Sequence, residues 1–219
     1  MAREGMAQHG TAVFTHEQTS GRGQRERSWQ SQKDQNIAIS FVLAPDQLPG
    51  SSIFSLNMSI ANAVHQFLSR FIIEDLAIKW PNDIYWRDRK AAGILIENLW
   101  QGTQWNRAIA GIGININQTD FGDLGKKAVS IRQITGQIHS PLELAKELCL
   151  TLNDHLLPGA PSPAPYYLEH LYRKGQTVKF KKDSRLFEAV IKTVDENGRL
   201  VVQHAIEERF AAGDVEIRG

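Results

Sequence analysis

The first group of residues suited to chemistry lies in the segment HEQTSGRGQRERSW, residues 16–29. Gly21 and Gly23 allow backbone amides to approach a ligand closely, and Arg22 places a planar cation beside them. This combination suits a phosphate, but the segment is neither a P-loop nor a dinucleotide fingerprint, because no Lys-Ser or Lys-Thr pair and no helix follows the glycines. Taken alone, it leaves two alternatives open: a solvated, arginine-bearing turn, and a single-stranded nucleic-acid site in which Trp29 stacks on a base.

A second group lies in KWPNDIYW, residues 79–86, where a predicted strand breaks at Pro81. Lys79, Asn82 and Asp83 bring an amine, an amide and a carboxylate to this break. Such a set suits electrostatic catalysis and metal binding. A Pro-Asn-Asp sequence is by itself more often an ordinary turn, and the lysine that enters it favours a functional role.

A third group is RKAAGILIEN, in which Lys90 precedes two alanines and Gly93 at the start of an apolar strand. Small residues at this point leave room for a ligand beside the lysine.

A fourth group is AGIGININ, in which Gly111 and Gly113 interrupt a strand and Asn115 and Asn117 share one face. Glycine inside a strand often marks the close approach of a ligand or another backbone segment. Each of these segments alone is ambiguous.

The elements that must position these residues follow from the spacing of apolar side chains. Strands are predicted at 11–15, 36–43, 76–80, 92–100 and 107–117, with a tight turn at 86–90 that indicates a hairpin. Helices are predicted at 51–71, capped by Ser51 or Ser52, and at 141–156, where Pro141 follows a capping Ser140. A proline cluster at 158–165 marks the approach to a domain boundary, and the short strands after Arg173 predict a small β-barrel.

The composition describes a soluble globular protein of 219 residues, 42% hydrophobic and 22% charged. The formal net charge of +1 provides no general field that would recruit nucleic acid or an anionic membrane. The single cysteine, Cys149, excludes an intramolecular disulfide and is predicted to be a small buried hydrophobic residue. No signal-peptide core and no run of about 18 apolar residues is found, so a cytoplasmic location is predicted.

Taken together, in this order and at these spacings, the four segments EQTSGRGQRERSW, KWPNDIYW, KAAGILIEN and GIGININ resemble the biotin protein ligases. The resemblance covers essentially the whole chain. It implies an α+β fold: residues 1–172 form a catalytic domain with a mixed β-sheet packed with helices, like that of class II aminoacyl-tRNA synthetases, and residues 173–219 form an SH3-like barrel. Lipoate ligases and octanoyl transferases share the catalytic fold but do not usually carry both the Gly-Arg-Gly loop and Lys-Trp-Pro-Asn-Asp.

The resemblance implies a reaction in two steps that uses biotin, ATP and Mg²⁺. The biotin carboxylate attacks the α-phosphate of ATP and releases pyrophosphate, and a lysine of a biotin carboxyl carrier domain then attacks biotinyl-AMP. The partners implied are this carrier protein and a second copy of the chain in a homodimer. Because no helix-turn-helix domain precedes the catalytic part, no nucleic acid other than ATP is expected, and no membrane. A lipoate or octanoate enzyme on the same fold, and a nucleic-acid-binding module, are the alternatives.

The resemblance also assigns roles to single residues. Lys90 would bind the biotin carboxylate and the phosphate and be the most sensitive position, Arg22 would face the carboxylate or the α-phosphate, and Asp83 would orient the carrier lysine. The residues assigned to binding are Gln18, Gly21, Arg22, Gly23, Gln24, Trp29, Lys79, Asn82, Lys90, Gly93, Gly111 and Asn115. Asn82 and Asp83 match a polar pair near the metal, and no residue is assigned as a direct metal ligand.

Two departures from the family pattern affect these expectations. Glu26 stands where the family usually has glycine and adds a negative charge near an anionic intermediate. The sequence starts at Met1, in what looks like the middle of a helix, so that residues 2–10 would be its last turns and the family's Ser-Thr-Asn segment is not included. For these reasons weak biotin binding and impaired ligation are expected.

Overall fold

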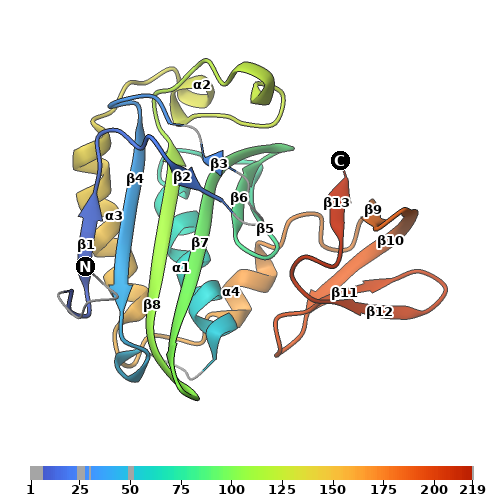
Figure 1. Ribbon diagram of the computed structural model, residues 1–219. Coiled ribbons are helices and arrows are strands. Elements are labelled where there is room, and N and C mark those ends of the chain that lie inside the picture. Colours follow the sequence, from blue (N-terminus) through green and yellow to red (C-terminus); the bar gives the residue numbers. More distant parts are fainter. Residues whose placement is uncertain (1–6, 24–27, 30, 49–51, 219) are drawn as a thin grey trace.

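Two large β-sheets and four α-helices dominate the computed structural model, which describes residues 7–23, 28–29, 31–48 and 52–218 (Figure 1). The first sheet has the strand order β1-β4-β8-β7-β6-β5, and all of its strand pairs are antiparallel. Its strands are β1 (Thr11–Phe14), β4 (Asn36–Leu43), β5 (Leu76–Lys79), β6 (Asp83–Trp86), β7 (Arg89–Gln101) and β8 (Gln104–Asn115). The α+β class is confirmed, and the parallel pairings in the described residues are isolated bridges such as Ile78–Leu171.

The two long helices begin where the sequence predicts a cap. The side chain of Ser52 accepts a hydrogen bond from the Ser55 amide (3.0 Å), and that of Ser140 accepts one from the Glu143 amide (3.4 Å). The helices are α1 (Ile53–Ser69), α2 (Ile131–Thr135), α3 (Pro141–Leu156) and α4 (Ala164–Glu169). The helices predicted at 51–71 and 141–156 are therefore confirmed, and none of the described helices is long and apolar enough to cross a membrane.

The two faces of the first sheet differ because strand residues alternate in direction. On one face Ile39 and Ile112 join Ile60 and Phe67 of α1 in the hydrophobic core, and α1 and α3 lie on this side (Figure 1). The opposite face carries small residues, and the short strands β2 (Gly21–Arg22) and β3 (Ser28–Trp29) lie over it. The sheet therefore offers one face to the core and leaves the other for a site.

The second sheet follows in the C-terminal part of the chain, with the order β12-β11-β10-β9-β13 and antiparallel pairing throughout. Its strands are β9 (Thr177–Lys182), β10 (Arg185–Val194), β11 (Leu200–Gln203), β12 (Glu207–Phe210) and β13 (Glu216–Arg218). Buried Phe180, Ile191, Val202 and Phe210 give it an apolar interior. This arrangement is consistent with the small barrel-like domain predicted from the sequence; the boundary between residues 172 and 173 stays a prediction.

Two expectations about the chain are corrected where the structure describes them. The helix expected over residues 2–10 is not found in residues 7–10, where residues 9 and 10 form a turn and Gly10 has a φ of +81°; residues 2–6 lie outside the described residues. The Gly10 amide donates to the Val42 carbonyl (2.9 Å), so this residue already takes part in the pairing of β1 with β4. Cys149 is half-buried and not fully buried; it packs against the core, and burial raises the pKa of its thiol, which opposes nucleophilic reactivity.

His65 of α1 is a buried polar residue whose contacts indicate that folding stability depends on pH. Its Nε2 faces the Leu76 carbonyl (3.3 Å) and its Nδ1 faces the Tyr166 hydroxyl (2.9 Å), while its ring lies 4.4 Å from that of His170. Since a carbonyl can only accept, Nε2 carries the proton of the neutral ring. Burial, together with the neighbouring His170, lowers the pKa of His65 to about 4, although the hydrogen bond to Leu76 opposes the shift.

We expect this residue to make folding stability fall with acid. The unfolded chain binds a proton near the ordinary histidine pKa of 6.5 and the folded chain only near 4, so stability is fully present above pH 6.5 and is lost as the pH falls toward 4. The loss should be on the order of 3 kcal/mol at about pH 4. Urea melts at a series of pH values, repeated on His65→Gln, test this expectation, and an equally steep slope in the variant would contradict it.

Candidate active site

A cavity of about 1250 Å³ lies over the outer face of the first sheet. Its floor comes from residues that stand side by side in the strand register, with Asp83 opposite Gly93, Gly93 opposite Gly113, and Gly113 opposite Ala38. The predicted site residues that line it are Gln18, Arg22, Gly23, Trp29, Asp83, Lys90, Gly93, Gly111 and Asn115. Residues more than 90 positions apart in the chain therefore meet at one cavity.

Lys90 and Asp83 form an ion pair inside this cavity, with 2.7 Å between Lys90 Nζ and Asp83 Oδ1. About a third of each side chain is exposed, 31% for the lysine and 27% for the aspartate. The pairing register of β6 and β7 shifts between Ile84 and Tyr85, so that Tyr85 pairs with Lys90 and Ile84 with Ala92. This bulge brings Lys90 onto the cavity face. With strict alternation from Gly93, the side chain of Lys90 would point to the opposite face of the sheet.

The backbone around Lys90 is fixed on both sides. Its amide donates to the Lys127 carbonyl (2.7 Å), and its carbonyl accepts from the Val129 amide (3.0 Å). The buried Asn115 side chain donates to the carbonyls of Lys90 and Val129, each at 3.2 Å. Asn115 thus borders the cavity while its amide nitrogen holds the lysine strand in place.

Trp29 fills the space above two of the glycines. A Cβ atom on Gly113 would lie 2.5 Å from Cε2 and Cζ2 of the indole, and one on Gly93 would lie 2.7 Å from Nζ of Lys90. The Lys90 ammonium is also 5.8 Å from the centre of the indole ring. From the sequence these glycines are expected to leave room for a ligand, whereas in this structure the room is taken by Trp29 and Lys90, and the open floor lies over Gly111.

Lys79 and Asn82 line a neighbouring cavity of about 840 Å³ and not the first one. The Lys79 ammonium lies 4.3 Å from the ring centre of Tyr85, and burial lowers its pKa, against the attraction of Asp83. Asn82 is buried and its amide nitrogen donates to the Ile94 carbonyl. Asp83 lines both cavities, together with Tyr85, Leu124 and Lys127, so the two cavities adjoin at these residues.

Two further predicted residues lie in the Gly-Arg-Gly loop. Gly21 pairs with Trp29 between β2 and β3, so closely that a Cβ atom would overlap the Trp29 carbonyl. Gln24 lies outside the described residues, as does Glu26.

One wall of the cavity is not predicted from the sequence. It is formed by residues 121–124 and 127–128, which include the 3₁₀-helix η2 (Gly122–Leu124) and Lys127. The segment shows no strand or helix period; its signals are glycines at 122 and 125 and a pair of lysines at 126 and 127. Such a loop is placed by the fold and not by its own pattern.

The described residues contain no group of three or more His, Cys, Asp or Glu side chains that could hold a metal ion. Mg²⁺ is usually held by one or two carboxylates together with substrate phosphates and water, so a dedicated protein cage is not needed. Asp83 and Asp123, which both line the cavity, fit this mode of binding.

Comparison with known proteins identifies the family. Residues 3–115 match the biotin/lipoate A/B protein ligase family, and the chain belongs to it. Over 134 residues it is 39% identical to the bifunctional ligase/repressor BirA of Bacillus spizizenii, covering 60% of this chain and 41% of that protein. Over 139 residues it is 33% identical to a biotin–[acetyl-CoA-carboxylase] ligase of Paracoccus denitrificans, covering 60% of this chain and 56% of the relative. The chain thus spans about half the length of these curated relatives, or less.

The fold has a counterpart among solved structures. A biotin protein ligase from Aquifex aeolicus in complex with biotin and ATP superposes with a TM-score of 0.81 and 24% identity, covering 97% of this chain and 90% of the other. This likeness extends through the second sheet and confirms the fold expected from the resemblance.

Proposed function

We propose that the protein activates biotin with ATP and transfers it to a lysine of a biotin carboxyl carrier domain. The observation that carries this proposal is the meeting of Arg22, Trp29, Asp83 and Lys90 at one cavity on the sheet. Two cations and a covering aromatic ring suit a ligand with an apolar body and an anionic end. The name of the relative from Paracoccus denitrificans, a biotin–[acetyl-CoA-carboxylase] ligase, supports biotin as that ligand.

In the first step a carboxylate oxygen of biotin forms a bond to the α-phosphorus of ATP, and the bond from that phosphorus to the bridging oxygen of pyrophosphate breaks. Two anions must approach each other, so cations fixed in advance lower the barrier. Lys90 and Arg22, which both line the cavity, are our candidates for this role. Bound Mg²⁺ would neutralise phosphate charge, with Asp83 and Asp123 as its candidate protein contacts.

In the second step the amine of the carrier lysine attacks the acyl carbon of biotinyl-AMP, and AMP leaves. The attacking amine must lose its proton. Asp83 borders both cavities and is our candidate to orient the incoming lysine and accept that proton. We propose that the carrier lysine enters through the neighbouring cavity, which Lys79, Asn82 and Asp83 line.

Three further elements of this proposal rest on the sequence. They are a homodimer, a cytoplasmic site of action and the absence of any nucleic-acid ligand other than ATP. In the described residues β1 is an edge strand of the first sheet and could pair with a second copy, whereas the other outer strand, β5, is bridged to Leu171.

Exchange of labelled pyrophosphate into ATP tests the first step, because exchange requires reversible formation of the acyl-adenylate. We expect exchange with biotin and at least tenfold less with lipoate or octanoate at equal concentration. Transfer of biotin to a carrier domain, detected by mass spectrometry, tests the second step. Exchange driven by lipoate in preference to biotin would replace this function with that of a lipoate ligase.

A further inference from the structure

The segment between β5 and β6, residues 79–83, is fixed by contacts from three directions. The Tyr167 hydroxyl of α4 donates to the Pro81 carbonyl (2.8 Å). The Ile94 amide of β7 donates to the Asn82 carbonyl (3.2 Å), and the Asn82 side chain donates to the Ile94 carbonyl in return. The third contact comes from the second sheet.

That third contact is a hydrogen bond from Nε1 of Trp80 to the carbonyl of Gly198, at 3.0 Å and across 118 positions of the chain. Trp80 is 6% exposed, so its indole nitrogen has no access to bulk water that could replace the bond. Gly198 stands in the turn between β10 and β11, in the C-terminal part of the molecule. The turn between two strands of the second sheet is thus hydrogen-bonded, through the Gly198 carbonyl, to Trp80.

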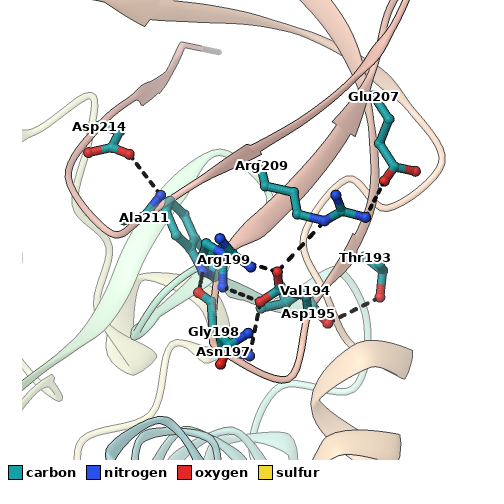
Figure 2. Close-up of polar contacts among 11 residues, drawn as sticks. Thr193, Val194, Asp195, Asn197, Gly198, Arg199, Glu207, Arg209, Ala211 and Asp214 are labelled. Carbon is teal, nitrogen blue, oxygen red and sulfur yellow. Dashed lines mark hydrogen bonds and ion pairs between the residues drawn. The ribbon is translucent and has the colours of Figure 1, made fainter.

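The turn that presents this carbonyl is itself tightly held, as Figure 2 shows. Asp195 accepts hydrogen bonds from the amides of Asn197 and Arg199 and from Nε of Arg199, each at 3.0 Å. Gly198 has a φ of +78°, and a Cβ atom there would lie 2.5 Å from Cδ2 of Phe54 at the start of α1. Only glycine therefore allows the turn to seat against α1 and reach the indole.

We propose that the β10–β11 turn is a positioning element of the active site, which acts by holding Trp80 and, through it, the carboxylate of Asp83. This inference rests on the proposed function. Asp83 is three residues beyond Trp80 and reaches Lys90 at 2.7 Å, so a shift of the segment changes the ion pair that faces the cavity. Misplacement by about 1 Å can slow catalysis about a hundredfold when reacting groups must be aligned.

The residues that the turn holds and the glycines beneath the ligand cavity belong to different strands. Gly93, Gly111, Gly113 and Trp29 belong to β7, β8 and β3, whereas the Gly198 carbonyl is bonded to Trp80 in the segment between β5 and β6. Loss of the Trp80–Gly198 bond should therefore lower the rate of the chemical step and leave in place the part of the cavity floor that β7 and β8 form.

The decisive variant is Gly198→Ala, with Gly175→Ala as its control. Gly175 has a nearly equal φ of +76°, but a Cβ atom added there would meet nothing within 4 Å, so the control carries the backbone strain without the clash. We expect Gly198→Ala to lower kcat of pyrophosphate exchange by about tenfold or more, with biotin Kd changed less than about twofold. The control should leave both unchanged. A folded Gly198→Ala protein with unchanged kcat, or with kcat and biotin affinity reduced in proportion, would overturn the proposal.

A double-mutant cycle shows whether the effect passes through Asp83. Trp80→Phe removes the donor and keeps an aromatic ring; added to Asp83→Asn, it should cause less than about a twofold further loss of kcat. Fully additive losses would count against the proposal.

Hydrogen exchange of the amides in residues 79–86, followed by mass spectrometry, needs no activity. Gly198→Ala should speed this exchange, and Gly175→Ala should not. If the wild type lacks biotin-dependent exchange of pyrophosphate, the proposed function fails while this measurement still decides whether the turn holds the segment. Unchanged protection in Gly198→Ala would refute the contact's role directly.

Discussion

Lys90→Ala is expected to reduce biotin-dependent pyrophosphate exchange by roughly 10²- to 10³-fold, the usual scale for removing one fixed charge-stabilising group. Its ammonium is the cation paired with Asp83 in the cavity, and only 31% of its side chain is exposed, so water screens it weakly. The substitution removes a positive charge where two anions must meet and leaves the Asp83 carboxylate without its partner. Both effects oppose the approach of the biotin carboxylate to ATP.

The matched control for this variant is Lys146→Ala. Lys146 lies on α3, pairs with Glu143 at 2.8 Å and is 64% exposed, so exchange should be unchanged when it is removed. Equal thermal stability of the two variants would exclude unfolding as the cause of a loss. Full activity of Lys90→Ala, in exchange and in transfer to a carrier domain, would remove the central assignment of the site.

Gly113→Ala should weaken biotin binding by about 10- to 100-fold, because overpacking of a filled space typically costs about 1–3 kcal/mol. The new methyl group would meet the indole of Trp29 at 2.5 Å. Trp29 is half-buried and belongs to the two-residue strand β3, outside the six-stranded sheet, so we expect the indole to move away while that sheet stays folded. Isothermal titration with biotin, paired with a thermal melt, measures both parts of this expectation.

Two comparisons make this result specific. Gly111→Ala lies two residues away on the same face, and its nearest contacts would be ordinary ones of 3.7 Å and 3.9 Å, so it should not displace Trp29. In a Trp29→Ala background, Gly113→Ala should cost little further affinity, since the group it clashes with is gone. A strong effect that persists in that background would show that Gly113 matters for another reason.

Much of the fold follows from local pattern. The strand at 36–43 and the helix at 141–156 have the bounds that the sequence predicts, because the first is a short β-rich apolar run and the second begins with a capping serine followed by proline. β6 is not predicted as a separate strand. It has four residues and begins shortly after Pro81, so its pairing with β5 and β7 comes from neighbours and not from its own sequence.

The candidate site is predictable in its residue types but not in its arrangement. Glycines and arginines in the loop indicate an anionic ligand, and Lys90 indicates the strand that would meet it. The grouping of Lys79 and Asn82 with the neighbouring cavity depends on which way each side chain leaves the segment at 79–83. The wall at residues 121–128 depends on loop geometry. Neither the direction of these side chains nor the shape of this loop leaves a periodic pattern in the sequence, so a single sequence could not predict them.

The bulge between β6 and β7 decides on which face of the sheet Lys90 lies. Lys90 faces the cavity because one extra residue, Ala91, is left without a partner where Tyr85 pairs with Lys90 and Ile84 with Ala92. The face on which the lysine lies thus depends on the register of the two strands and not on the identity of their residues. If Ala91 paired with Tyr85 in a regular ladder, Lys90 would turn toward the hydrophobic core although every functional side chain stayed in the sequence. Deletion of Ala91 would instead remove the bulge and leave Lys90 opposite Tyr85, still on the cavity face.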